Sequence, residues 1–285
     1  MYSLLAYKHT IVLGDSRSMP ELESESIQFV VTSPPYWNLK KYTEREQGEE
    51  EANSRSHFLE DVYSLYLQSI YDVFKEVKRV IQPGRFVAIN IGTAVSKEGM
   101  KPIHADIIKQ MENLGFKFKK EIIWVKPKGT QGLWQRGVTK FLKKEPYPCF
   151  FNLNIIHEYI LIFQNEGQLK LDLQSNHKLS EHFIKEVSWS IWQLPVSYTK
   201  GHPAPFPDCI PERLIRLYTF ENETVLDPFA GSGTTMRVSR NLNRNSIIYE
   251  INPNYIKLIK DKLDWNNAIL DSNISYKIKI RRKRA

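Results

Sequence analysis

The strongest constraint on the fold is the alternation of short apolar segments with amphipathic segments in the last third of the chain. Residues 210–220 and 234–242 have helical periodicity, whereas TVLD at 224–227 and SIIYE at 246–250 are short apolar runs. Strands that alternate with helices are typical of a mostly parallel sheet with helices on both faces. The sequence therefore predicts an α/β fold.

The first half of the chain repeats this pattern. Apolar residues recur every three to four positions between 57 and 81, which predicts an amphipathic helix that ends at Pro83-Gly84. A second helix is expected at 104–115, with Gly115 at its end. The polar segment 43–56 is expected to be an exposed loop. The expected strands of this half are 11–13, 27–32, 85–92 and 120–125, with 157–163 as an antiparallel partner of the last.

Size and composition set the remaining limits. At 285 residues the chain is large enough for one α/β domain, alone or with a small insert. No apolar run approaches the roughly 18 residues of a membrane span, and the N-terminus lacks the basic region of a signal peptide. Cys149 and Cys209 lie far apart without C-x-x-C spacing. This spacing argues against a disulfide framework and a zinc site, and we expect a cytoplasmic protein without a metal.

The net charge of +8 favours a polyanionic partner such as nucleic acid, with ordinary solubility charge as the alternative. The C-terminal KIKIRRKRA at 277–285 is expected to be a basic tail, which either contacts phosphate or is disordered.

The segment TVLDPFAGSGTT at 224–235 is the first candidate site. Ligands bind at the carboxyl ends of strands in such sheets, and Gly231 and Gly233 allow a close approach to the backbone. A P-loop would require a Lys before Thr234, and a dinucleotide fingerprint would require a Gly at Met236. Glu250 ends the next strand, where a carboxylate is placed to accept both hydroxyls of a ribose. A structural turn and a surface glutamate are the alternatives.

The segment VVTSPPYWN at 30–38 is the second candidate site. Pro34-Pro35 cannot continue a strand or a helix, so the chain turns there, with Ser33 on one side and Tyr36-Trp37 on the other. Taken alone, the segment is compatible with a proline-stiffened strand exit that has no catalytic role.

Together these segments resemble the amino-directed DNA methyltransferases that use S-adenosylmethionine. The catalytic motif of that family, (D/N/S)-P-P-(Y/F/W), is matched by Ser33-Pro34-Pro35-Tyr36, and its cofactor motif, F-x-G-x-G, by residues 229–233. The catalytic motif comes first, which resembles the β group, a circular permutation of the same sheet. The resemblance implies a Rossmann-like methyltransferase fold, mostly parallel with an antiparallel hairpin, and with a target-recognition insert.

The resemblance also divides the chain. It implies a catalytic half at 1–127, a hairpin with the target-recognition insert at 128–200, a cofactor-binding half of the same domain at 201–270, and a basic tail at 271–285. Two further segments, LGDS at 13–16 and residues 201–219, resemble family segments near the cofactor. The implied cofactor-binding residues are Asp15, Thr32, His202, Pro203, Asp227, Pro228, Phe229, Ala230, Gly231, Ser232, Gly233, Thr234, Glu250 and Asn252.

The chemistry implied for the proline segment is methylation of an exocyclic amine, whose lone pair is delocalised into the ring. Acceptors on the two amino protons favour the tetrahedral nitrogen that forms during attack. The resemblance assigns these acceptors to the Ser33 side chain and the Pro34 carbonyl, and makes Ser33, Pro34, Pro35 and Tyr36 the catalytic residues. The base must leave the duplex, and Tyr36 and Trp37 are expected to form its pocket.

Serine at the first motif position goes mostly with N4 of cytosine in the family, and aspartate mostly with N6 of adenine. We therefore expect a cytosine-N4 DNA methyltransferase. The alternatives are an adenine-N6 enzyme and a non-catalytic nucleic-acid-binding protein with this fold.

The expected partners are double-stranded DNA and, by family habit in prokaryotes, a companion restriction endonuclease, with the chain as a monomer or homodimer. Arginine can read guanine, and lysine can bind phosphate. The variable blocks 128–150 and 165–197 contain aromatic and basic residues, with Trp189 and Trp192 in the second. We expect at least one block to recognise the target, and solvated loops with buried aromatic residues are the alternative. The expected DNA-binding residues are Lys128, Arg136, Lys140, Lys143 and Lys144.

Overall fold

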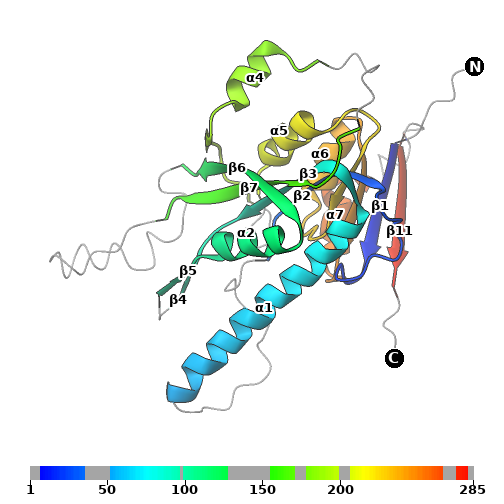
Figure 1. The fold of residues 1–285 in the computed structure, drawn as a ribbon. Helices are drawn as coiled ribbons and strands as arrows, with labels where there is room; N and C mark the ends of the chain where they lie inside the picture. The colour runs from blue at the N-terminus through cyan, green and yellow to red at the C-terminus, as the bar shows by residue number, and fades with distance from the viewer. Residues whose placement is uncertain are drawn as a thin grey trace, which may run out of the picture.

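The computed structural model of the chain describes residues 7–35, 52–96, 99–127, 155–170, 178–198, 206–265 and 274–281. Within these residues the fold is a twisted sheet between two layers of helices (Figure 1). The layers are held by buried apolar side chains on both faces of the sheet.

The described strands form a nine-stranded sheet in the order β11-β1-β10-β9-β2-β3-β7-β6-β8. All neighbours pair in parallel except β7, which is antiparallel to both β3 and β6. A separate antiparallel ribbon joins β4 (Ala94–Ser96) to β5 (Gly99–Lys101). The strands of the sheet are β1 (Tyr7–Leu13), β2 (Ile27–Thr32), β3 (Ile81–Ile91), β6 (Phe116–Val125), β7 (His157–Asn165), β8 (Ile191–Gln193), β9 (Thr224–Asp227), β10 (Asn245–Glu250) and β11 (Ile274–Ile280).

Side chains at the centre of β2, residues 29–31, alternate between the two cores, which explains why these three consecutive residues are apolar. Val30 packs under helices α1 (Ala52–Val80) and α2 (Ile103–Asn113). Phe29 and Val31 point to the other face, against α5 (Cys209–Tyr218). Two more helices, α6 (Thr234–Asn241) and α7 (Tyr255–Lys262), cover the same face near β10 and β1. No helix in the described part of the chain is long and apolar enough to cross a membrane.

The structure confirms the predicted α/β class, the mostly parallel sheet and the antiparallel hairpin of β6 and β7. It corrects the end of the first long helix. That helix ends at Val80, and Pro83 and Gly84 lie inside β3. Gly84 has a φ of 74°, and the pairing of β3 with β2 shifts register there. The pair therefore forms an irregularity in a strand and does not separate the helix from the strand.

Three segments contain regular structure that the sequence analysis did not predict. The helix α4 (Glu181–Val187) and the strand β8 lie in the block 165–197. Ser180 caps the amino end of α4, where its Oγ accepts a hydrogen bond from Phe183 N at 3.2 Å. The helix α1 begins at Ala52, inside the polar segment expected to be a loop, whose residues 43–51 lie outside the described residues. Much of the expected basic tail is the edge strand β11, paired along its whole length with β1.

Candidate active site

Four neighbouring parallel strands, β1, β10, β9 and β2, end at one edge of the sheet. Asp15 follows the end of β1, Glu250 and Asp227 end β10 and β9, and Ser33 follows β2. We call this edge the carboxyl edge. Ligands of open α/β sheets bind at such edges, so the topology gathers residues from distant parts of the sequence into one candidate site.

Thr32 and Asp227 link the two candidate segments directly. Thr32 Oγ1 donates a hydrogen bond to Asp227 Oδ1 at 2.6 Å, across a separation of 195 positions in the sequence. Both side chains are buried. The turn at Ser33 and the loop after Asp227 are therefore held in a fixed relation by one buried contact between the last residues of β2 and β9.

Asp227 also organises the loop that follows it. Its Oδ1 accepts a hydrogen bond from Phe229 N at 3.0 Å, and its Oδ2 accepts one from Thr235 Oγ1 at 2.6 Å. Burial raises the pKa of this carboxyl, and the hydrogen bonds from Thr235, Thr32 and Phe229 oppose that rise. These three bonds tie Asp227 to β2, to the loop and to α6, so its carboxylate supports the loop.

Glycine is required where this loop turns into α6. Gly233 has a φ of 78° and immediately precedes the helix, and Gly231 has a φ of 51°. A Cβ on Gly233 would lie 3.0 Å from Ile259 Cγ2, so a side chain there would be both strained and crowded. Phe229 and Gly231 are half-buried. The other predicted loop residues, Pro228, Ala230, Ser232, Gly233 and Thr234, are buried.

Glu250 closes the loop from the side of β10. Its Oε2 accepts a hydrogen bond from Gly231 N at 2.8 Å, and its Oε1 accepts one from Asn252 N at 2.8 Å. Burial raises the pKa of Glu250 to about 7, although these backbone donors act to lower it. A backbone hydrogen bond from Ile251 acts in the same direction. A carboxylate has about four acceptor positions, so acceptor capacity remains beside these backbone donors.

Asp15 and Asn252 belong to two loops that adjoin Glu250, since Gly14 N donates to Glu250 O at 2.9 Å and Asn252 N donates to Glu250 Oε1. Asp15 Oδ1 accepts a hydrogen bond from Arg17 N at 2.9 Å, and Oδ2 accepts one from the Arg17 guanidinium at 2.6 Å. Burial acts to raise the pKa of Asp15, but the bonds from Arg17 lower it overall. Asn252 Oδ1 accepts a hydrogen bond from Asn254 N at 3.0 Å, which fixes the turn into α7.

Lys262 is a site residue that the sequence analysis did not identify. Its Nζ donates hydrogen bonds to Ser232 Oγ at 2.6 Å and to Thr234 Oγ1 at 2.8 Å, from the last turn of α7. Burial, followed by the charge of Arg237, lowers the pKa of this amine to about 8. A lysine near the end of a helix is common, so the sequence alone did not point to a role for Lys262. Its role is visible only from its contact with the end of the loop 228–233, which contains Gly231 and Gly233 and is called the glycine loop below.

The described part of the turn after β2 consists of Ser33, Pro34 and Pro35. Ser33 is half-buried, Pro34 is buried and Pro35 is exposed. No group of three or more His, Cys, Asp or Glu within the described ranges is placed to hold a metal ion. Several predicted site residues lie outside the described residues: Tyr36, Trp37, His202, Pro203, Lys128, Arg136, Lys140, Lys143 and Lys144.

Comparison with protein families decides the identity of this site. Residues 27–261 match the profile of the N6/N4 DNA methylase family, a span that contains both candidate segments. The chain belongs to this family of DNA methylases.

Curated relatives of this methylase agree with that assignment. The chain is 36% identical to the type II methyltransferase M.MjaI of Methanocaldococcus jannaschii, over 90% of this chain and 91% of the relative. It is 34% identical to the type II methyltransferase M.MthZI of Methanothermobacter thermautotrophicus, over 90% of this chain and 76% of the relative.

Solved structures share the fold of this methylase. One, assigned as a DNA modification methylase of Thermus thermophilus and complexed with S-adenosyl-L-methionine, superposes with a TM-score of 0.73 at 26% identity. The match covers 97% of this chain and all of that one. The cytosine-N4-specific PvuII DNA methyltransferase superposes with a TM-score of 0.65 at 21% identity, over 95% of this chain and 91% of the other, and shows the fold alone.

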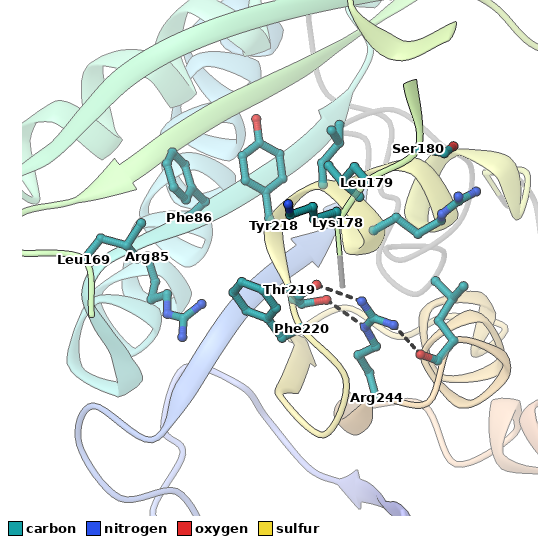
Figure 2. Close-up of a pocket in the computed structure, with 13 residues that line it drawn as sticks. Arg85, Phe86, Leu169, Lys178, Leu179, Ser180, Tyr218, Thr219, Phe220 and Arg244 are labelled. Carbon is teal, nitrogen blue, oxygen red and sulfur yellow. Dashed lines mark hydrogen bonds between the residues drawn. The ribbon is translucent and has the colours of Figure 1, made fainter. Parts of the chain in front are cut away.

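The cavity in Figure 2 is not part of the candidate site of this methylase. It has a volume of about 420 Å³, and its lining includes Arg85 in the first half of β3, Tyr218 at the end of α5 and Arg244 just before β10. Arg244 Nε donates to Thr219 Oγ1 at 3.0 Å, and another guanidinium nitrogen donates to Thr219 O at 2.7 Å. These residues lie toward the amino ends of the strands, opposite the carboxyl edge.

The two tryptophans of the block 165–197 have different environments. Trp192 in β8 is 1% exposed and packs in the core with α4 and α5. Trp189, three positions earlier, is 73% exposed. β8 pairs in parallel with the last residues of β6, so it lies at the same carboxyl edge as the end of β2. Trp189 is therefore an exposed aromatic side chain in the short segment between α4 and β8.

Proposed function

We propose that this methylase transfers a methyl group from S-adenosylmethionine to the exocyclic N4 of cytosine, in a base flipped out of double-stranded DNA. The observation that carries the proposal is the buried bond from Thr32 to Asp227, which fixes Ser33 beside the glycine loop. Catalysis by proximity and orientation requires that the residues that hold the base and those that hold the cofactor keep a fixed geometry relative to each other.

The carboxyl edge suits the parts of S-adenosylmethionine. The Glu250 carboxylate ends β10 beside the glycine loop and keeps acceptor capacity beyond its backbone donors, which suits ribose hydroxyls. Gly231 and Gly233 present bare backbone, and the amino end of α6 offers free N–H groups to a carboxylate. A relative of known structure with this fold is complexed with the same cofactor. When bound, the cofactor supplies an electrophilic methyl group.

The turn after β2 then orients the amine that attacks. The Ser33 hydroxyl and the Pro34 carbonyl accept the two amino protons, which favours the tetrahedral nitrogen of the transition state. The two prolines limit rotation of the backbone, so the carbonyl stays aimed. A serine hydroxyl is not ionised near neutral pH, so Ser33 orients the amine without removing its proton beforehand. We place Tyr36 against the flipped base as a stacking surface, with Trp37 in the same pocket.

Serine at position 33 favours cytosine N4 over adenine N6, by resemblance to family members with serine there. The physical basis is partial, because cytosine N4/N3 and adenine N6/N1 present the same pattern of donor and acceptor. Incubation of mixed-sequence DNA with the chain and labelled cofactor, followed by nucleoside analysis, tests the assignment. We expect N4-methylcytosine. N6-methyladenine alone would favour the second candidate, and absence of label would favour a non-catalytic nucleic-acid-binding protein.

We also propose that residues 1–127 and 201–270 form two halves of one catalytic domain, and that 128–200 contains the target-recognition insert. Strands of the two halves alternate in the sheet, where β9 and β10 lie between β1 and β2, and this supports a single domain. In this proposal the insert binds DNA through five basic residues, and the methylase acts alongside a companion restriction endonuclease. The five basic residues are Lys128, Arg136, Lys140, Lys143 and Lys144.

A further inference from the structure

The C-terminal strand β11 brings one arginine to the carboxyl edge. β11 pairs in parallel with β1 from Ile274 opposite Tyr7 to Ile280 opposite Leu13, and the two strands lie side by side in Figure 1. Arg281 continues this ladder, because its backbone N donates to Leu13 O at 3.1 Å. The side chain of Arg281 therefore begins where β1 ends.

The guanidinium of Arg281 is hydrogen-bonded to the loop that follows β1. Its Nε donates to Glu21 Oε1 at 2.6 Å, and a terminal nitrogen donates to Glu21 Oε2. The other terminal nitrogen donates to the backbone oxygen of Asp15 at 2.8 Å. The side chains of Arg281 and Glu21 are 22% and 16% exposed. A forked pair of this kind, partly withdrawn from water, fixes orientation as well as distance.

The same contact reaches the strand that carries Glu250. Tyr249 OH donates to Glu21 Oε2 at 3.0 Å, and the Arg281 guanidinium lies 5.3 Å from the Tyr249 ring centroid. Gly14 makes room for the arginine, since a Cβ there would lie 2.8 Å from Arg281 Cδ. The N–H of Gly14 in turn donates to Glu250 O at 2.9 Å. Arg281 thus holds the loop 14–21 against β10, next to Glu250.

We propose that Arg281 is a positioning residue that sets the affinity for S-adenosylmethionine by holding the loop 14–21 in place. The C-terminal strand then belongs to the cofactor site and not to the DNA-binding surface. The inference rests on the proposed function, in which the carboxyl edge binds the cofactor. A loop ordered in advance costs less entropy when the ligand binds, and this is how a residue that need not touch the ligand changes its affinity.

The test compares Arg281→Met, Arg281→Lys and Glu21→Gln with Lys277→Met, a control at an exposed position of β11. Calorimetry gives the Kd for S-adenosylmethionine, steady-state assays give KM and kcat, and a binding assay at fixed salt gives DNA affinity. We expect Arg281→Met and Glu21→Gln to weaken cofactor binding about tenfold to a hundredfold, as expected for loss of a charge-assisted pair. Arg281→Lys should weaken cofactor binding by a smaller factor, because an ammonium keeps the positive charge but lacks the planar fork of the guanidinium.

The expected pattern is a raised KM for the cofactor with kcat and DNA affinity near the wild-type values, and a control that matches wild type. Unchanged cofactor affinity with weakened DNA binding would overturn the proposal and make Arg281 a phosphate contact. Unfolding of both Arg281→Met and Glu21→Gln would also overturn it and make the pair a stability element. If the wild-type chain binds no S-adenosylmethionine, the proposed function fails first, and this inference fails with it.

Discussion

Thr32 Oγ1 lies 2.6 Å from Asp227 Oδ1, and this buried hydrogen bond joins the ends of β2 and β9. Asp227 also receives bonds from Phe229 N and Thr235 Oγ1. One carboxylate therefore fixes the turn at Ser33, the glycine loop and the start of α6 together.

Replacement of Thr32 by Val should remove this link while keeping the shape of the side chain. A buried carboxylate that loses a donor should reduce the free energy of unfolding by about 1–3 kcal/mol, measured by urea denaturation. Cofactor affinity and methyl transfer should both fall, because the loop and the turn lose their common support. Thr32→Ser keeps the hydroxyl and should resemble wild type. Wild-type stability and activity in Thr32→Val would contradict the role given to the bond.

Ser33→Ala and Tyr36→Ala should impair methyl transfer much more than cofactor binding. Ser33 is assigned to the amino group and Tyr36 to the face of the base, so neither is expected to hold the cofactor. By analogy with the loss of one oxyanion-hole donor, removal of one hydrogen bond made to the transition state should cost about 10²–10³ in kcat. The measurements are single-turnover methyl transfer and cofactor titration of the same preparations. An equal loss of cofactor affinity in both variants would argue against these roles.

Glu250 should make both stability and cofactor binding depend on pH. Burial raises its pKa from 4.5 to about 7 in the folded chain. The folded state then binds more protons than the unfolded state between these values, so the contribution of Glu250 to the free energy of unfolding falls as pH rises through this range. In Glu250→Gln this part of the pH dependence of unfolding should be absent.

Cofactor affinity should follow the opposite trend. Ribose hydroxyls donate more strongly to an ionised carboxylate, so binding should release a proton near pH 7, the value to which the pKa of Glu250 is raised. Affinity should be higher at about pH 8 than at about pH 6, and calorimetry in buffers of different ionisation enthalpy should detect the released proton. Glu250→Gln should bind weakly and without this dependence. Equal wild-type affinity at the two pH values would count against the ribose assignment.

Trp189 and Trp192 form a matched pair for testing the recognition insert. Trp192→Ala should cost about 3–5 kcal/mol of unfolding free energy, since it empties a buried site. Trp189→Ala should change stability by less than about 0.5 kcal/mol, because the side chain is exposed. If the insert contacts DNA, Trp189→Ala should weaken DNA binding at constant salt. Full DNA affinity in Trp189→Ala would exclude this tryptophan from the interface.

Local patterns predicted most of the sheet and the carboxyl edge, and contacts between distant segments produced the rest. The apolar runs of β9 and β10, and the glycines between β9 and α6, are visible in the sequence because period and backbone freedom are local properties. β11 was not predicted, because its lysines resemble a basic tail and its partner β1 is at the other end of the chain. Lys262 was missed because its acceptors are distant in the sequence: Ser232 lies in the loop before α6, and Thr234 is the first residue of α6.

The identity of the methylated base tests the central claim most directly. The chain and its Ser33→Ala variant are expressed in a host without DNA methylation, and the genome is then mapped for modified bases. The account predicts N4-methylcytosine within one recurring sequence for the wild-type chain and a strong loss of it for the variant. N6-methyladenine at such sites, or the same methylation in the variant, would contradict it.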